Sequence, residues 1–183
     1  MTRATVDGIE GVTLQPFTPH RDERGSLTEI WRANTQEGSA PRQWNVVRSE
    51  QGVLRGVHVH QRHHDLLLLA EGAAVIGLHD LRAASPSFRR AATVELRAGS
   101  GAIAIPPGVA HGFCFTEPSI HVYAVSHYFD PADEHGCRFD DPELRLDWPV
   151  TEPLISERDA ALPSLAELMS TLPPQVPAAE PLV

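Results

Sequence analysis

Short runs of apolar residues, separated by glycine and proline turns, fill the chain as far as about residue 155. Turn signals stand at Glu71-Gly72, Gly99-Ser-Gly101 and Pro106-Pro-Gly108, because proline restricts φ and glycine accepts the positive φ that many turns require. The runs between them alternate or are continuously apolar, and they lack helical periodicity. This pattern predicts an antiparallel β-sandwich or barrel.

The expected strands are followed by a helical ending. We expect strands at residues 11–17, 26–31, 43–48, 66–70, 73–80, 92–96, 102–105, 111–115 and 121–129, with a charged turn at 20–25 that joins the first two as a hairpin. Ser156-x-x-Asp159 and Ser164-x-x-Glu167 have capping-box spacing, which predicts one or two short helices. The length of 183 residues fits one domain. We assign it to residues 1–170 and expect the proline-rich residues 171–183 to be a loose tail.

Charge and cysteine content restrict the kind of partner. The chain has 15 basic and 24 acidic residues, a formal charge of −9, which argues against a nucleic-acid or anionic-membrane partner. A small anionic ligand is compatible with this charge, since a few arginines suffice for one diphosphate. Cys114 and Cys137 form no Cys-x-x-Cys pair, and no segment approaches the roughly eighteen apolar residues of a membrane-spanning helix. We therefore predict a soluble, cytoplasmic protein without a disulfide framework.

Four of the ten histidines fall within the eleven residues from Arg55 to Asp65. His58 and His60 are separated by one apolar residue, and on a strand this spacing puts both imidazoles on the same face. Such a pair fits a reactive site, but it also fits two histidines that face solvent on a half-polar strand. The wider pattern of the sequence has to decide between these interpretations.

That wider pattern resembles the cupins. His58-x-His60, followed by Asp65 and Gly72, has the spacing of the first cupin motif with aspartate in place of the usual glutamate. The segment that ends in Pro107-Gly-Val-Ala-His111 resembles the second motif, which brings a further histidine across the barrel. The resemblance implies an all-β, cupin-type jelly-roll barrel, which the short C-terminal helices would complete.

Within the cupins, the chain most resembles the nucleoside-diphospho-4-keto-6-deoxysugar epimerases, the family of dTDP-4-dehydrorhamnose 3,5-epimerase. The similarity runs from about residue 14 to residue 166. The matching segments are residues 22–25, 53–58, 85–88, 105–113, 140–142, 147–149 and 156–160. The resemblance implies an isomerase that epimerises C3, C5 or both carbons of a 4-keto sugar nucleotide, without a cofactor or metal, and it implies a homodimer.

The resemblance also implies roles for individual residues. His58 matches the family's base, since imidazole has a pKa suited to proton abstraction at neutral pH. Asp159 matches the carboxylate that holds this histidine, and Tyr123 matches the acid that delivers a proton to the opposite face. The positions that match substrate-binding residues are Arg24, Glu29, Gln43, Asn45, Arg55, His60 and His111, some of which reach into the partner subunit.

Each of these residues also has a structural interpretation. Asp159 at the third position of a capping box is consistent with a purely capping role, and Tyr123 with a core aromatic. Arg24 fits an exposed turn, and His111 a solvent-facing turn histidine. No catalytic role is expected for the remaining histidines at His63, His64, His79, His121, His127 and His135.

Two positions depart from the family pattern. The epimerases usually carry glutamine at the position of His60 and lysine at the position of Asp65. An anion near a developing oxyanion should impair catalysis, unless Asp65 is turned away, protonated or paired with His60, His63 or Arg62.

These departures keep other functions open. One is a metal-dependent cupin that uses His58, His60, Asp65 and His111, because imidazole and carboxylate suit Fe(II), Mn(II), Ni(II) or Zn(II). Another is a sugar-nucleotide 3,4-ketoisomerase, which Arg55-Gly-x-His-x-His60 resembles. A third is a non-catalytic sugar-binding cupin, since fold alone does not determine function.

Overall fold

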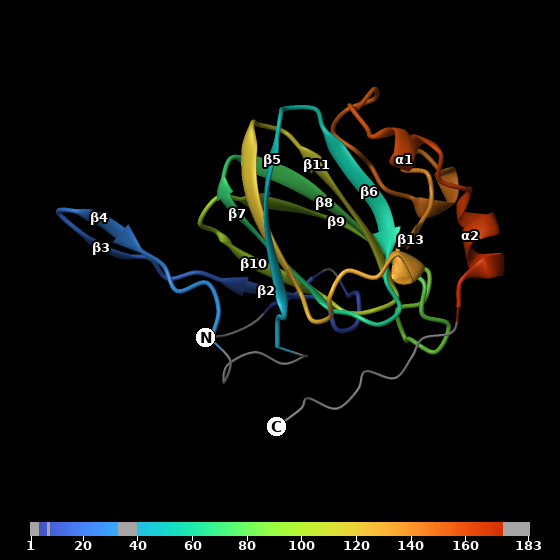
Figure 1. Ribbon diagram of the computed structural model, residues 1–183, viewed down its shortest axis with the longest axis horizontal. Coiled ribbons are helices and arrows are strands. Elements are labelled where there is room, and N and C mark those ends of the chain that lie inside the picture. Colours follow the sequence, from blue (N-terminus) through green and yellow to red (C-terminus); the bar gives the residue numbers. More distant parts are fainter. Residues whose placement is uncertain (1–3, 7, 33–39, 174–183) are drawn as a thin grey trace.

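The computed structural model describes residues 4–6, 8–32 and 40–173, and its regular structure is mostly β-strand (Figure 1). The strands are β1 Ala4–Thr5, β2 Thr13–Pro16, β3 His20–Asp22, β4 Gly25–Leu27, β5 Gln43–Ser49, β6 Leu54–Val59, β7 Asp65–Glu71, β8 Ala73–Asp80, β9 Ala91–Arg97, β10 Gly101–Ile105, β11 Val109–Phe115, β12 Ser119–Val125 and β13 His135–Gly136. The helices are the 3-10 turns η1 Pro131–Asp133 and η2 Pro142–Leu144, then α1 Glu157–Ala160 and α2 Leu165–Thr171. None of these helices is long and apolar enough to cross a membrane.

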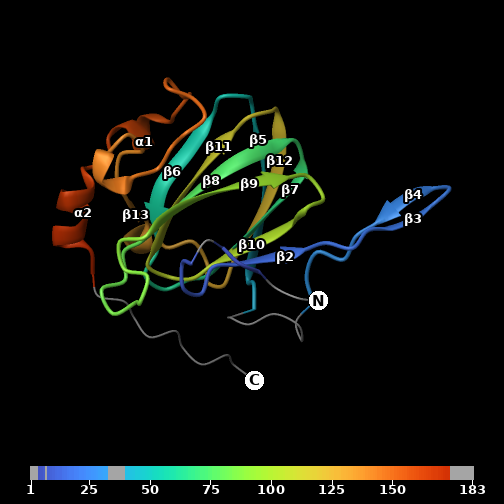
Figure 2. The same cartoon turned by 180° about the vertical axis from the view of Figure 1, so that it is seen from behind.

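Two main sheets form the body of the molecule (Figures 1 and 2). One has the order β1-β2-β10-β7-β12-β5 and the other the order β13-β6-β11-β8-β9. From β7 to β12 the chain crosses repeatedly between the sheets, as in a jelly roll. The predicted all-β fold with short C-terminal helices is confirmed. The two sheets are hydrogen-bonded separately in the described part of the chain, so they form a sandwich and not a closed barrel.

Strand β7 shows why an unbroken apolar run forms a strand here. Leu67 and Leu69 face the main core between the sheets, whereas Leu66 and Leu68 belong to a second apolar cluster on the outer face. Because alternate side chains point to opposite faces, both faces of this strand are covered. The same alternation points Asp65, at the start of the strand, in the direction of Leu67.

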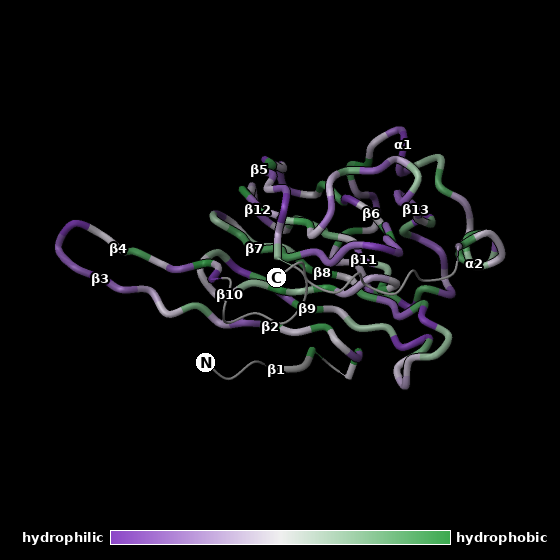
Figure 3. Tube along the Cα trace, turned by 60° about the horizontal axis from the view of Figure 1, so that its bottom comes forward, coloured by the Kyte–Doolittle hydropathy of each residue, from purple (hydrophilic) through white to green (hydrophobic). Residues whose placement is uncertain are grey.

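The β3–β4 hairpin projects away from the two sheets and is mostly hydrophilic (Figures 1 and 3). Its described residues are exposed. The sequence predicted a hairpin made of residues 11–17 and 26–31, but the pairing is between His20–Asp22 and Gly25–Leu27, inside the predicted turn. Because neither face of this hairpin is buried, the alternation of apolar and polar residues does not determine which residues of β3 and β4 pair.

The C-terminal helices begin at the predicted caps. The side-chain oxygen of Ser156 accepts from the backbone N–H of Asp159, and Ser164 forms a complete capping box with Glu167. Helix α1 packs on β6 and α2 on β13 (Figure 1). The predicted tail begins one residue too early, because Thr171 is still helical, and residues 174–183 lie outside the described part.

Several predicted boundaries shift. The strand predicted at 121–129 ends at Val125, and residues 28–31 are not a strand. The short elements β1, β13, η1 and η2 were not predicted. The loop expected at 33–42 is described only at residues 40–42, which contain no helix or strand.

Candidate active site

A cavity of about 290 Å³ lies between the two sheets, near α1. Seven of the ten predicted site residues line it: Gln43, Arg55, His58, His60, His111, Tyr123 and Asp159. The side chains come from β5, β7 and β12 of one sheet, from β6 and β11 of the other, and from the segments around η1 and α1. The fold therefore brings together residues from Gln43 to Asp159, which are more than a hundred positions apart in the sequence.

Strand alternation accounts for much of this convergence. On β12, His121, Tyr123 and Val125 all face the cavity, and Asp65 and Leu67 of β7 do the same. Tyr123 is opposite Leu67 in the β7–β12 ladder. On each of these strands, the residues that face the cavity are therefore every second residue.

The close approach of β6 and β11 positions the histidines of the opposite sheet. His58 and His111 are register partners across these strands. Gly56 has φ of 117°, and a Cβ placed there would lie 2.7 Å from Cα of Gly112 and 2.8 Å from the carbonyl oxygen of His111. Only glycine fits this backbone conformation and spacing, so Gly56 is needed for the strand pairing that sets His58 opposite His111.

The carboxylate of Asp159 holds His58. Its Oδ1 lies 2.8 Å from His58 Nε2, and its Oδ2 accepts a hydrogen bond from Gly56 N–H at 3.3 Å. The backbone N–H of Asp159 separately donates to Ser156 Oγ at 3.1 Å. Burial of Asp159 opposes its ionisation, but the contacts with His58 outweigh this and lower its pKa. Asp159 therefore combines a capping role in its backbone with a histidine contact in its side chain.

Tyr123 enters the cavity from the sheet opposite to that of His58. The residue is half-buried. Burial, together with the nearby carboxylates of Glu134 and Asp65, raises the pKa of its phenol. The phenol therefore stays protonated at neutral pH.

Asp65 is surrounded by imidazoles. Its carboxylate oxygens lie 3.6 Å from His63 Nε2 and 3.9 Å from His111 Nε2, while Arg62 turns away to pair with Asp130. Burial alone would raise the pKa of Asp65, but the polar contact from His63 outweighs it and keeps the pKa below its ordinary value. Of the arrangements considered for this aspartate, the structure has the one in which it is paired with histidine.

The other predicted binding residues divide into two groups. Arg55 donates to Ser49 Oγ at 3.1 Å, and the amide of Gln43 donates to Asn45 Oδ1 at 3.2 Å, so these side chains are held at the cavity. Asn45 itself does not line the cavity, and its Nδ2 is buried without a partner among the described atoms. Gln43 and Asn45 are two residues apart on β5, so their side chains point to the same face of the strand. Of the two, Gln43 lines the cavity.

Arg24 and Glu29 do not reach the cavity of their own chain. Arg24 lies beyond β3, its side chain is 84% exposed, and it pairs with Asp22. Glu29 pairs with Arg32 on the same N-terminal segment. Arg24 is in the turn of the β3–β4 hairpin and Glu29 follows this hairpin, so both lie outside the site that this chain forms alone.

The sequence did not single out several residues that line the cavity. His63 and His121, for which no role was expected, both face it, as do Glu134 and Arg158, which pair with each other at 2.9 Å. Burial, and to a smaller extent Arg55, lowers the pKa of His121 to about 4. Period-two spacing from Tyr123 could have identified His121. Nothing in the sequence indicated that Glu134 would be close to His60.

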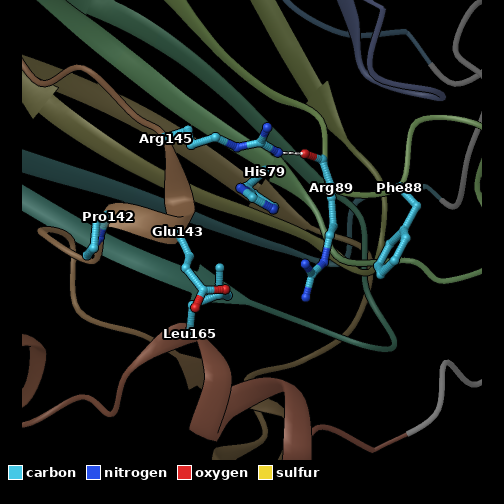
Figure 4. Close-up of a pocket in the computed structure, with 7 residues that line it drawn as sticks. All are labelled: His79, Phe88, Arg89, Pro142, Glu143, Arg145 and Leu165. Atoms are coloured by element: carbon cyan, nitrogen blue, oxygen red, sulfur yellow. Dashed lines mark hydrogen bonds between the residues drawn. The ribbon is translucent and has the colours of Figure 1, made fainter.

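A second, larger cavity of about 500 Å³ lies outside this site (Figure 4). His79, Phe88, Arg89, Pro142, Glu143, Arg145 and Leu165 line it. The guanidinium of Arg145 donates to the carbonyl of Arg89, and the Nδ1 of His79 donates to the carbonyl of Leu144 at 2.9 Å. None of the ten predicted site residues borders this cavity, so the chemistry is assigned to the smaller one.

Comparison with known proteins identifies the family. The family model described as dTDP-4-dehydrorhamnose 3,5-epimerase matches residues 7–167. The chain belongs to the dTDP-4-dehydrorhamnose 3,5-epimerase family. A member of this family from Streptomyces griseus is 30% identical over 87% of this chain and 85% of its own length. A dTDP-4-dehydrorhamnose 3-epimerase from Streptomyces niveus is 34% identical, over 87% of this chain and 82% of its own.

A solved structure from the family has the same fold. The dTDP-6-deoxy-D-glucose-3,5-epimerase of Legionella pneumophila, in complex with dTDP-4-keto-L-rhamnose, superposes with a TM-score of 0.86. The two chains are 29% identical, and the superposition covers 95% of this chain and 98% of the other. The family resemblance recognised in the sequence is thus confirmed.

Proposed function

We propose that this chain epimerises C3, C5 or both carbons of a nucleoside-diphospho-4-keto-6-deoxyhexose, with dTDP as the nucleotide. Membership of the epimerase family supports the reaction class. The similar proteins include both 3,5-epimerases and a 3-epimerase, and the complex from Legionella pneumophila holds a dTDP-4-keto sugar.

The observation that carries the proposal is the placement of His58 and Tyr123 on opposite sheets of one cavity. Epimerisation removes a proton from one face of the sugar ring and returns a proton to the other. A base and an acid on opposite walls satisfy this requirement, provided that the ring lies between them. The C–H bonds next to a ketone are acidic enough for an imidazole base, because the carbanion is delocalised into an enolate.

Each residue then has one role. His58 takes the proton and becomes an imidazolium, which Asp159 stabilises across the 2.8 Å contact. Tyr123 donates its phenolic proton to the opposite face of the enolate carbon. Arg55 places a guanidinium at the cavity wall, where it is suited to donate to the enolate oxygen or a phosphate.

We further infer that the protein acts as a cytoplasmic homodimer in which Arg24 and Glu29 serve the cavity of the partner subunit. Arg24 is in the turn of the projecting β3–β4 hairpin and Glu29 follows this hairpin, and both lie outside the cavity of their own chain. Trp44 and Val46 leave an apolar surface on β5, at the edge of the larger sheet, 42% and 70% exposed. An exposed edge strand with apolar side chains favours pairing with a second copy.

The free, buried cysteines Cys114 and Cys137 suit a reducing compartment, which supports the cytoplasmic location.

Incubation with dTDP-4-keto-6-deoxyglucose in D₂O tests the reaction. Deuterium should appear at C3, C5 or both carbons, and NMR of the product identifies which. A His58→Asn variant should lose the exchange. If neither carbon exchanges with a panel of 4-keto sugar nucleotides, the proposed function is wrong. Appearance of a 3-keto product would instead favour the ketoisomerase.

A further inference from the structure

Three imidazoles crowd around one buried carboxylate in the cavity. The rings of His60 and His63 are stacked with centroids 4.0 Å apart, and those of His60 and His111 are 5.4 Å apart. Asp65 lies among them. Within the described residues, the three that each offer a ligand atom within 4.8 Å of the others are His60, His63 and Asp65. All three are buried.

The outer nitrogen of each ring faces an acceptor. Nδ1 of His60 lies 3.1 Å from the backbone carbonyl oxygen of Asp133, and Nδ1 of His63 lies 3.5 Å from the side-chain carboxylate of Asp133. Nδ1 of His111 lies 3.0 Å from the carbonyl of Val109. Since these oxygens only accept, each Nδ1 carries a proton. Nε2 of His63 and of His111 faces the carboxylate of Asp65, where a bound cation would take the place of a proton on the ring. Metal-binding histidines are oriented in this way by outer partners.

The distances between the inner atoms also suit an ion. His63 Nε2 and Asp65 Oδ1 are 3.6 Å apart, too far for a good hydrogen bond. Two ligands that each lie about 2.1 Å from one ion, at angles of roughly 90–109°, are about 3.0–3.4 Å apart. A shift of a few tenths of an ångström would therefore place both atoms around one cation. His111 Nε2, at 3.9 Å from the other oxygen of Asp65, stands next to this group.

We propose that His60, His63 and Asp65 bind a divalent transition-metal cation in the epimerase cavity, with His111 as the adjacent fourth ligand. The set differs from the one considered in the sequence, because the Nε2 of His58 is bonded to Asp159 and His63 takes its place. Two or three imidazoles with a carboxylate suit Zn²⁺, Fe²⁺, Mn²⁺ or Ni²⁺.

The ion would supply positive charge to a site that has no lysine. All 15 basic residues of the chain are arginines, and Asp65 stands where the family resemblance implies a lysine. A cation held by Asp65 would reverse the sign of the local charge, and it would supply a Lewis acid for the enolate oxygen. The role of the ion at the enolate oxygen deepens the proposed function and rests on it. Binding of the ion by these residues does not depend on the proposed function.

Metal content tests the site directly. Protein purified without chelators or metal-affinity steps is analysed by mass spectrometry for metals, then stripped with a chelator and titrated with Zn²⁺ by calorimetry. We expect one equivalent, and a Co²⁺-loaded form with visible d–d absorption. His63→Ala and Asp65→Asn should each weaken Zn²⁺ binding by at least tenfold, and Asp133→Asn, which removes the charge facing Nδ1 of His63, by about 10- to 100-fold.

His64→Ala is the matched control. His64 is adjacent to His63 but does not line the cavity, so this variant should bind Zn²⁺ as the wild type does. The site is refuted if the stripped wild type binds less than a tenth of an equivalent, or if His63→Ala and His64→Ala bind equally well. Deuterium exchange in the metal-free enzyme together with no metal binding refutes the metal site and leaves the epimerase intact. Metal binding without deuterium exchange on any 4-keto sugar supports the metal site and refutes the proposed epimerase function.

Discussion

Asp159 Oδ1 lies 2.8 Å from Nε2 of His58, although the two residues are 101 positions apart in the sequence. The contact joins helix α1 to strand β6 at the wall of the cavity. The cap that starts α1 uses a different part of the same residue, its backbone N–H. The proposed catalytic role of Asp159 and its capping role can therefore be separated by mutation.

Asp159→Asn should lower kcat by roughly a hundredfold or more, since an amide does not stabilise the imidazolium of His58 as a carboxylate does. The melting temperature should change little, because Asn retains the backbone N–H that donates to Ser156 Oγ at 3.1 Å. Steady-state kinetics and thermal unfolding measure the two effects. A large loss of stability with kcat preserved would assign Asp159 to capping alone.

The double variant His58→Asn, Asp159→Asn gives a sharper comparison. Residues that act as a unit are not additive. The double variant should therefore be no slower than His58→Asn. A further hundredfold loss would mean that Asp159 acts independently of His58.

Tyr123→Phe should separate proton removal from proton delivery. Its phenol stands on the sheet opposite to that of His58, so His58 can still remove and return a proton on one face. In D₂O, the variant should exchange deuterium into the substrate with its configuration retained, while epimer formation falls at least tenfold. NMR distinguishes these products. Equal losses of exchange and epimerisation would make Tyr123 a binding residue and not the acid.

The strand faces and helix starts were predictable because they depend on short-range spacing. Alternation along β12 puts Tyr123 on the same face as His121 and Val125, and the serine caps located both helices. Tyr123 itself was singled out by the family resemblance. The family resemblance, and not the spacing, paired His58 with Asp159. Residue spacing alone was equally consistent with a capping role for Asp159.

The surroundings of His60 and His63 were not predictable in the same way. Asp133 and Glu134 reach them from the 3-10 turn η1 and its cap, about seventy positions away. A turn of this kind has no hydrophobic period, and its place depends on how the chain returns after β12. Hence the sequence suggested a metal set that included His58, whereas the structure groups His60 and Asp65 with His63.

Val46→Asp should convert the proposed dimer into a monomer. Val46 is 70% exposed on the edge strand β5, and a charge there would be desolvated on pairing with a second copy. Light scattering coupled to size exclusion measures the mass. Leu154→Asp is the control, since Leu154 is also exposed, at 63%, but pairs with Val53 beside β6, which belongs to the other sheet. Equal behaviour of the two variants would contradict an interface at β5.

Asp80 is fully buried at the end of β8 and is the centre of a polar network. It pairs with Arg82 at 2.8 Å, and the hydroxyls of Ser85 and Ser87 donate to it at 2.6 and 2.5 Å. Burial opposes its ionisation, but Arg82 and the two serines outweigh this and lower its pKa to about 2. Ser85 and Ser87 belong to one of the segments shared with the epimerase family, so this network gives that segment a structural role.

Because the folded pKa of Asp80 lies below the ordinary value, the carboxylate stabilises the fold above about pH 4, and this contribution is lost as pH falls toward 2. The loss should amount to about 2 kcal/mol. At neutral pH, Asp80→Asn should lower the free energy of unfolding by about 3 kcal/mol, since Arg82 loses its charged partner. Denaturant unfolding from pH 7 to pH 2.5 measures both. The gap between wild type and variant should narrow in acid, and a constant gap would mean that Asp80 is not ionised in the folded protein.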